Sequence, residues 1–337
     1  MKNLFKGIAL SFLCALSIDS FGQTEHKPLS SIQYGENPKL HARGLTANKK
    51  KIFVAASDGK LYIIDRKTET VEERDYHRNV ELRDIEVSKK YIILLASGDS
   101  SSTISINRKN DEYVINEYEG LFLDGISLVK NSLFMMGDPM SDRFMLFNSN
   151  DNGESWTQLD SLPQSIQGEA GFAASGTNVQ MTSIKNWYFV SGGMDSRFYS
   201  TNDAGKTWND SELGFKPCES CGAYSFIILP DNKTIVSVGG DYTKPDERIG
   251  TSRISNDGGT TWHSPKVDLM GYRSNVMHHR GIIYACGTNG IDVSTDFGES
   301  WSEFATGNYF IITVFKKQLV ASTIEGTLDF YSLQKKK

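Results

Sequence analysis

The sequence lacks the features that mark several large classes of protein. It has 30 glycines and 8 prolines in 337 residues, which excludes a collagen-like repeat. It has no basic excess, because 36 Lys and Arg stand against 41 Asp and Glu, so a nucleic-acid partner is not expected. No run of about 18 apolar residues is present, so we expect no membrane span. With 39% hydrophobic and 23% charged residues, the composition is that of an ordered globular chain.

The first 22 residues have the pattern of a secretory signal. Lys2 and Lys6 form a positive start, residues 7–18 form a short apolar core, and small residues stand at positions −3 and −1 before Gln23. The apolar core is too short for a membrane anchor. We therefore expect residues 1–22 to be removed, residues 23–337 to form one domain, and the mature chain to be exported to a periplasm or secreted.

Cysteine is scarce, and its arrangement leaves several interpretations open. After loss of Cys14, the chain keeps Cys218 and Cys221 in a CxxC pattern and an isolated Cys286. A CxxC pair is typical of a tight disulfide, half of a zinc site or a redox pair. No second CxxC or HxxxH lies nearby, so a structural disulfide or free thiols are favoured. We expect no bound metal and no cofactor.

A repeated motif is the strongest feature of the chain. The pattern S/T-x-D-x-G-x-S/T-W occurs at residues 149–156, 201–208, 255–262 and 294–301, and it contains four of the five tryptophans. Its fixed positions are Asp151, Gly153, Trp156, Asp203, Gly205, Trp208, Asp257, Gly259, Trp262, Asp296, Gly298 and Trp301.

The motif predicts a turn between two strands. The Asp is expected to accept backbone N–H groups two residues on, the Gly to take a positive φ, and the Trp to begin the next strand with its ring buried. In this pattern the sequence resembles the Asp-box, or bacterial neuraminidase repeat, of sialidases and other β-propellers. In those families the motif lies away from the active site, so the resemblance implies a structural role.

The runs between the motifs are short, β-rich and separated by glycine-containing breaks. They divide into six units of four strands, at residues 43–76, 83–118, 124–161, 169–209, 226–268 and 272–306. Three further strands, at 309–315, 318–323 and 327–333, lack a fourth, and a lone strand at 32–37 precedes the first unit. Pairing them closes a ring and removes the open edges. The prediction is an all-β, seven-bladed β-propeller of four-stranded antiparallel blades, and a monomer; the alternative is a six-bladed ring with a decorated end.

One face of such a ring collects charged residues. The innermost strands begin on this face, and the loops from second to third strand open on it. The candidate ligand or partner residues there are Arg43, Arg83, Asp84, Asp124, Asp138, Arg143, Glu169, Arg197, Asp241, Tyr242, Tyr272, Arg273 and Asp292. They form either a network of Arg–carboxylate pairs between blades or a site for a sugar acid, a peptide carboxylate or a protein loop.

A wider resemblance covers nearly the whole mature chain. The segments 82–85 (LRDI), 168–177 (GEAGFAASGT), 239–242 (GGDY) and 271–274 (GYRS) are similar to exported BNR-repeat proteins related to photosystem II stability and assembly factors. The resemblance implies a non-enzymatic propeller that binds partner proteins. Relatives are often labelled oxidoreductases, but this chain has no G-x-G-x-x-G after a strand and no C-x-x-C-H. Its first two blades lack the repeated motif, in contrast to the family.

Two functions follow as hypotheses. The first is an exported, non-catalytic scaffold that binds a protein or an envelope component through a charged Arg/carboxylate channel mouth, with no catalytic residues. The alternative is a sialidase-type glycoside hydrolase acting on acidic glycans. That chemistry uses three arginines on the substrate carboxylate, a Tyr–Glu pair and a separate Asp, all facing one pocket.

Overall fold

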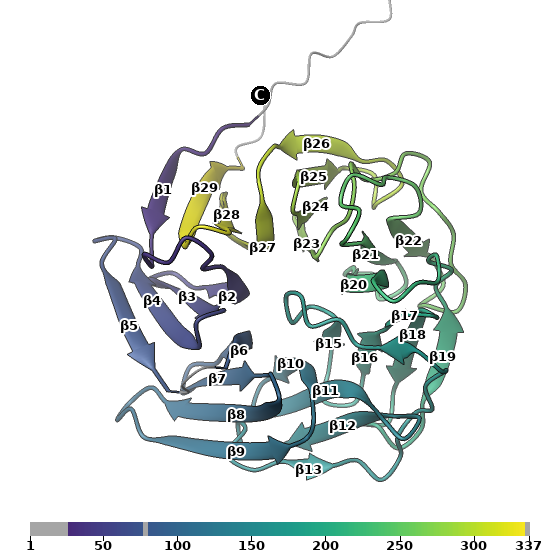
Figure 1. Ribbon diagram of the computed structural model, residues 1–337, viewed down its shortest axis with the longest axis horizontal. Coiled ribbons are helices and arrows are strands. Elements are labelled where there is room, and N and C mark those ends of the chain that lie inside the picture. The colour runs from purple at the N-terminus through teal and green to yellow at the C-terminus, as the bar shows by residue number, and fades with distance from the viewer. Residues whose placement is uncertain (1–25, 77–79, 334–337) are drawn as a thin grey trace, which may run out of the picture.

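A computed structural model describes residues 26–76 and 80–333 of the chain. Its 29 strands in these residues form seven sheets arranged as a ring around a central channel (Figure 1). Within these ranges, nothing forms a helix of the length and apolarity that crossing a membrane requires. The predicted signal sequence lies outside the described residues.

Five blades are meanders of consecutive or nearly consecutive strands. Blade one contains β2 (Ala42–Ala47), β3 (Lys51–Ala56), β4 (Lys60–Asp65) and β5 (Val71–Asp75). Blade two contains β6 (Leu82–Val87), β7 (Tyr91–Ala96), β8 (Ser100–Asn107) and β9 (Tyr113–Glu119). Blade three contains β10 (Leu123–Val129), β11 (Ser132–Met140), β12 (Arg143–Ser149) and β13 (Thr157–Gln158). Blade four contains β15 (Val179–Met181), β16 (Trp187–Val190), β18 (Arg197–Thr201) and β19 (Asn209–Glu212). Blade six contains β23 (Asn275–His279), β24 (Ile282–Gly287), β25 (Gly290–Ser294) and β26 (Ser302–Ala305).

The other two blades are less regular. Blade five contains β20 (Cys221–Ile228), β21 (Ile235–Asp241) and β22 (Ser252–Ser255), and beyond β20 its sheet continues through β17 (Gly192–Gly193) to β14 (Glu169–Ala170). Blade seven contains β27 (Tyr309–Phe315), β28 (Gln318–Thr323), β29 (Thr327–Ser332) and β1 (Ser30–Gln33).

The hydrophobic core lies between the blades. The second strands, such as β3 (KIFVAA) and β7 (YIILLA), are buried along almost their whole length, because neighbouring blades cover both of their faces. The outer strands β5 and β9 are mostly exposed and correspondingly polar or mixed. Burial therefore falls from the ring interior to its rim.

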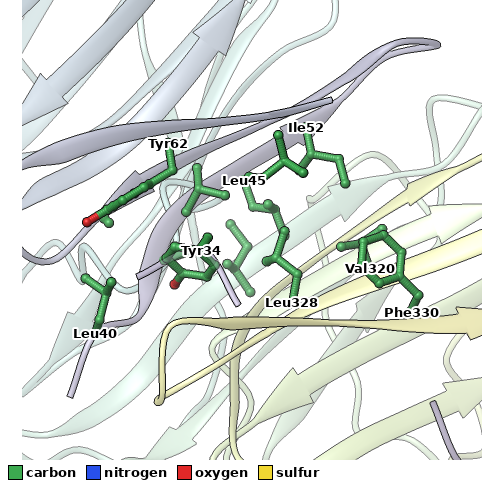
Figure 2. Packing of buried hydrophobic residues seen from close by; sticks show 13 residues of the cluster. Tyr34, Leu40, Leu45, Ile52, Tyr62, Val320, Leu328 and Phe330 are labelled. Atoms are coloured by element: carbon green, nitrogen blue, oxygen red, sulfur yellow. The ribbon is translucent and has the colours of Figure 1, made fainter. Parts of the chain in front are cut away.

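The ring closes by pairing the two ends of the described chain. β1 pairs antiparallel with β29, with Ser30 opposite Phe330 and Gln33 opposite Thr327. The next residue, Tyr34, is only 4% exposed and packs in one cluster with Tyr62 and Leu328 (Figure 2). The predicted seven-bladed ring is confirmed, and the six-bladed alternative is wrong, because this lone strand supplies the fourth strand of a complete blade.

Two strand predictions near blade five are wrong. Glu169 was expected to begin the innermost strand of blade four, but that strand is β15, and Glu169–Ala170 pairs with Gly192–Gly193 in the sheet of blade five. The expected outer strand at 262–268 is reduced to two isolated bridges, from His263 to Ile254 of the same blade and from Val267 to Ser300. The chain instead uses the residues after β14 to enter the central channel.

The repeated motif forms the turn between the third and fourth strands. In the third copy, the Asp257 carboxylate accepts the backbone N–H groups of Thr260 and Thr261, while Ser255 Oγ accepts Gly259 N–H at 2.8 Å. The Asp thus reaches three and four residues on, rather than two. The four motif glycines have φ between 79° and 92°, as expected. Each fourth strand or bridge begins one residue after the Trp, and Trp301 is the one fully buried ring among the four.

Candidate functional site: an aromatic and arginine pocket at the channel mouth

Residues 171–177 lie inside the central channel, and we call this segment the channel plug. It connects β14 to β15, and Figure 1 shows the loop before β15 reaching into the centre of the ring. The sequence GFAASGT is rich in small residues, which suits a segment that passes between seven converging strands. At Gly176, with φ of 68°, any Cβ would overlap the Asp84 carboxyl group. Glycine is therefore required where the plug crosses blade two.

The channel plug is hydrogen-bonded to blades on opposite sides of the ring. Arg83 Nη1 donates to the carbonyl of Ala173 at 3.2 Å. On the far side, Ser175 Oγ donates to the Ser274 carbonyl at 2.8 Å, and Thr177 Oγ1 lies 2.6 Å from Ser225 Oγ. These bonds satisfy polar groups that would otherwise be buried without partners. The plug closes the channel and gives the mouth a floor.

Above this floor lies a pocket of about 470 Å³, which we call the mouth pocket. Its walls come from residues that precede or begin innermost strands, and from the loops between second and third strands. Its lining residues are Arg43, Arg83, Phe122, Gly171, Phe172, Ala173, Ala174, Tyr224, Tyr242, Tyr272, Thr288 and Phe310. The repeated motifs join third and fourth strands, so they lie at the opposite face of the ring.

Among the described residues, two arginines provide the positive charge of the mouth pocket. The Arg43 guanidinium lies over the Phe310 ring at 5.2 Å, and that of Arg83 lies over Phe122 at 5.0 Å. Both arginines reach the same acid, since Glu81 Oε2 is 2.8 Å from Arg83 Nη2 and 3.7 Å from Arg43 Nε. Burial lowers the pKa of Arg43, and the Glu81 charge opposes this. Two guanidiniums thus share one carboxylate, which leaves an excess positive charge at the pocket.

Aromatic rings form the opposite wall. Phe172 of the channel plug stacks on Tyr224, with ring centroids 4.3 Å apart and planes 12° apart. Tyr224 meets Tyr272 edge to face at 4.8 Å, and its hydroxyl donates to the Ser220 carbonyl at 2.8 Å. Tyr242 is 56% exposed and stands at the rim. The wall is a fixed apolar surface with one accessible tyrosine.

Three predicted arginines do not face the mouth pocket. Arg273 has no exposed surface and forms a buried ion pair with Asp292, at 2.7 Å from Nη2 to Oδ2. Arg197 pairs with Asp195 on the loop before β18, and Arg143 Nη1 donates to the Leu162 carbonyl at 2.7 Å. Arg273 and Asp292 therefore form an Arg–carboxylate pair, as one of the two predictions expected. The pair lies within one blade, however, and not between two neighbouring blades.

The predicted acids are also withdrawn from the mouth pocket. Asp84 accepts backbone N–H groups from Ile85 and Ile126 and borders a separate chamber of about 310 Å³ beyond the plug. Asp124 is completely buried, and burial raises its pKa. Asp138 accepts the Gly171 N–H at 2.8 Å. Among the described residues, the lining of the mouth pocket is thus aromatic and cationic, and none of the predicted carboxylates contributes to it.

Two further acids from the predicted set have structural partners. Glu169 is 5% exposed and accepts hydrogen bonds from Ser191 Oγ and, at 2.8 Å, from the Tyr199 hydroxyl. Burial raises the pKa of Glu169. Asp241 is 7% exposed and accepts from Ser220 Oγ at 2.8 Å. Four of the thirteen predicted residues, namely Arg43, Arg83, Tyr242 and Tyr272, line the mouth pocket together.

The β-propeller fold of this chain is also found in solved structures. A chain of the structure titled "Crystal Structure of Mitotic Checkpoint Complex" is 11% identical, with a TM-score of 0.61 and 98% of each chain covered. The computationally designed Ika8 protein is 10% identical, with a TM-score of 0.61, 91% of this chain and 99% of that chain covered. At such identities the likeness shows the fold alone. No protein-family model matches this chain, and no curated protein matches it.

Sequence reasoning missed several aromatic residues of the mouth pocket. Phe122 directly precedes β10, and Phe310 is the second residue of β27, where an innermost strand begins. A search for aromatic residues at these strand starts, alongside the charged ones, identifies both. Phe172 carries no such signal, because it lies on the channel plug.

Among residues 26–76 and 80–333, the arrangement that the sialidase hypothesis requires is not formed around the mouth pocket. Two of the described arginines face the pocket, while Arg273 is held by Asp292. A Tyr–Glu pair exists, at Tyr199 and Glu169, but Tyr199 is 1% exposed and neither residue lines the pocket. Burial and the Glu169 charge raise the pKa of the Tyr199 hydroxyl, which disfavours the anion that acts as a nucleophile.

Proposed function

We propose that this chain is an exported, non-catalytic propeller that binds a partner protein through the mouth pocket. The resemblance to assembly factors and the predicted signal sequence support this assignment of class and location. The plugged channel supports it as well, since a fixed floor and fixed walls suit the binding of an inserted segment.

The sharing of Glu81 by Arg43 and Arg83 is the observation that carries the proposal. A carboxylate entering the pocket meets two guanidiniums whose charge is only half compensated, and both are held by aromatic rings. The Phe172–Tyr224 wall offers an apolar contact beside it. The expected ligand is therefore a protein segment that presents a carboxylate, from an acidic side chain or a C-terminus, next to an apolar side chain.

Binding of peptides to purified residues 23–337 tests the proposal. A fluorescent peptide library is screened in pairs that differ only in a free or amidated C-terminus and in Asp against Asn. We expect the carboxylate forms to bind and Arg43→Gln or Arg83→Gln to weaken binding by about tenfold or more, the usual loss for a charge-assisted hydrogen bond. Arg197→Gln is the matched control, because its guanidinium is paired with Asp195 and does not line the mouth pocket.

A panel of sialosides and other acidic glycosides is measured with the same proteins. If the parent protein hydrolyses one of these glycosides and Arg43→Gln does not, the result contradicts the non-catalytic scaffold. Binding of sugar acids without turnover shifts the ligand class from peptide to glycan. Peptide binding that is equal in Arg43→Gln, Arg83→Gln and the parent protein shows that the mouth pocket is not the binding face.

A further inference from the structure

The start of β20 and the end of β21 bring two sulfurs and a carboxylate together. Cys218 and Cys221 form a disulfide with Cα atoms 5.0 Å apart, and Cys221 is directly opposite Asp241 in the β20–β21 ladder. One atom from each of the three side chains lies within 4.8 Å of the others. Cys221 and Asp241 are 2% and 7% exposed. This cluster is separate from the residues that line the mouth pocket.

Hydrogen bonds hold one oxygen of the Asp241 carboxyl group in this cluster. Its Oδ1 accepts hydrogen bonds from Ser220 Oγ, from Thr243 N–H at 2.9 Å and from Thr243 Oγ1 at 2.6 Å. The other oxygen, Oδ2, has Lys244 Nζ at 3.9 Å. Oδ2 is therefore the oxygen with capacity for a further ligand.

A small cavity adjoins the cluster. Its volume is about 20 Å³, and Cys221, Asp241 and Glu247 contribute to its lining. Such a volume is enough for a single water-sized ligand. Glu247 lines the cavity and is exposed, and Lys216 Nζ lies 3.8 Å from its carboxylate. The cluster therefore has room for a small ion or water and a source of a fourth donor.

We propose that reduction of the Cys218–Cys221 disulfide converts this cluster into a zinc site. The disulfide takes two electrons and two protons from an external dithiol, which becomes a disulfide itself, and two thiols form. Zn²⁺ then displaces the two thiol protons and binds both thiolates and Asp241 Oδ2, with water or Glu247 in the fourth position. Two thiolates with a carboxylate suit zinc rather than magnesium or calcium, which prefer oxygen ligands alone.

The disulfide and the metal exclude each other, since the same two sulfurs serve both. The chain is thus expected to hold zinc in a reducing setting and a disulfide in an oxidising one. The signal for this cluster was present in the sequence as the CxxC pair. Its third ligand was not visible there, because Asp241 is 20 residues further on and reaches the pair through the strand register.

Metal titration of residues 23–337 carrying Cys286→Ser tests this proposal without interference from the third thiol. The protein is reduced, freed of reductant without oxygen, assayed for two free thiols and titrated with Co²⁺ and then Zn²⁺. We expect one equivalent to bind, with the intense near-ultraviolet absorption of a cobalt–thiolate bond that Zn²⁺ abolishes. The oxidised protein is expected to bind none.

Variants assign the ligands. Asp241→Asn is expected to weaken Zn²⁺ binding by about tenfold or more, while Asp195→Asn, an aspartate paired with Arg197, leaves it unchanged. Glu247→Gln distinguishes a carboxylate from water as fourth donor. Circular dichroism of each reduced variant verifies the fold. The proposal is overturned if the reduced, folded protein binds no metal, or if Cys218→Ser/Cys221→Ser binds it equally well.

Discussion

At the scale of single residues, the two adjacent glycines of the third repeated motif have different reasons to be glycine. Both have positive φ, 78° at Gly258 and 89° at Gly259. A Cβ on Gly258 would meet nothing nearer than a carbonyl at 3.9 Å, whereas one on Gly259 would overlap the Phe198 ring. The other motifs carry Asn152, Ala204 and Phe297 at the position of Gly258, all with positive φ.

We expect Gly259→Ala to lower the free energy of unfolding by about 3 kcal/mol, through backbone strain together with overpacking against Phe198. Gly258→Ala is the matched control and is expected to cost about 1 kcal/mol, since it adds strain alone. Urea denaturation of both variants and the parent measures this. Equal losses for the two glycines contradict the assigned contact.

The sequence was most informative about residues whose role is local. The Asp, Gly and Trp of the motif act within one turn, so their spacing alone predicted it. The sequence did not predict which charged residues line the mouth pocket and which lie away from it. This depends on the side of the channel plug on which each residue lies. Arg83 and Asp84 are adjacent, yet Arg83 lines the mouth pocket and Asp84 lies beyond the plug.

Asp84 makes a pH dependence of stability testable. Burial raises its pKa to about 7, although the N–H groups of Ile85 and Ile126 lower it. The unfolded chain therefore loses this proton at lower pH than the folded chain, so stability is full below about pH 4 and falls until about pH 7. Glu86 adds to the fall, because burial and the Asp84 charge raise its pKa to about 8.

Asp84→Asn cannot ionise at this position. Relative to the parent protein, the variant is expected to gain on the order of 2 to 4 kcal/mol in free energy of unfolding between about pH 4 and about pH 8. Urea denaturation at several pH values measures the difference. Asp99→Asn, an exposed aspartate before β8, is expected to follow the parent curve. Parallel curves for Asp84→Asn and the parent would show that Asp84 is already ionised without penalty.

At the scale of elements, the channel plug decides what the ring can bind. Without residues 171–177 the mouth pocket has no floor and lacks the Phe172 ring that stacks on Tyr224. Its sequence was expected to form a strand, because Glu169 stands where an innermost strand was due. The small residues that followed were the contrary signal, since Gly and Ala favour neither a strand nor its packing. Long-range contacts with Arg83 and Ser274 then determine its course.

At the scale of the whole molecule, the number of blades was predictable by counting. Six complete units, three strands at one end and one at the other leave a single closed arrangement of four-stranded blades. Pairing β1 with β29 uses residues almost 300 positions apart, and it removes the two edges that an open ring would expose. Counting strands does not reveal that the channel plug fills the channel, because this segment lies outside the repeating pattern of the blades.

The closure is open to a direct test at Tyr34, which follows β1. Its ring is 4% exposed among Leu40, Tyr62 and Leu328, and its hydroxyl lies 3.2 Å from Ser322 Oγ (Figure 2). Tyr34→Ala is expected to lower the free energy of unfolding by about 3 to 5 kcal/mol, as for other large buried rings. Since a domain is stable by only about 5–15 kcal/mol, such a loss shifts the urea midpoint strongly.

Leu29→Ala is the control from the same segment, because Leu29 is 67% exposed and only its backbone N–H bonds to Phe330. It is expected to unfold at the parent midpoint. Hydrogen exchange adds a spatial readout: if β1 closes the ring, Tyr34→Ala accelerates exchange along β29 and also in β2, whose blade shares the Tyr34 cluster. Faster exchange confined to residues 30–34, with an unchanged midpoint, would mean that the ring holds together without this strand.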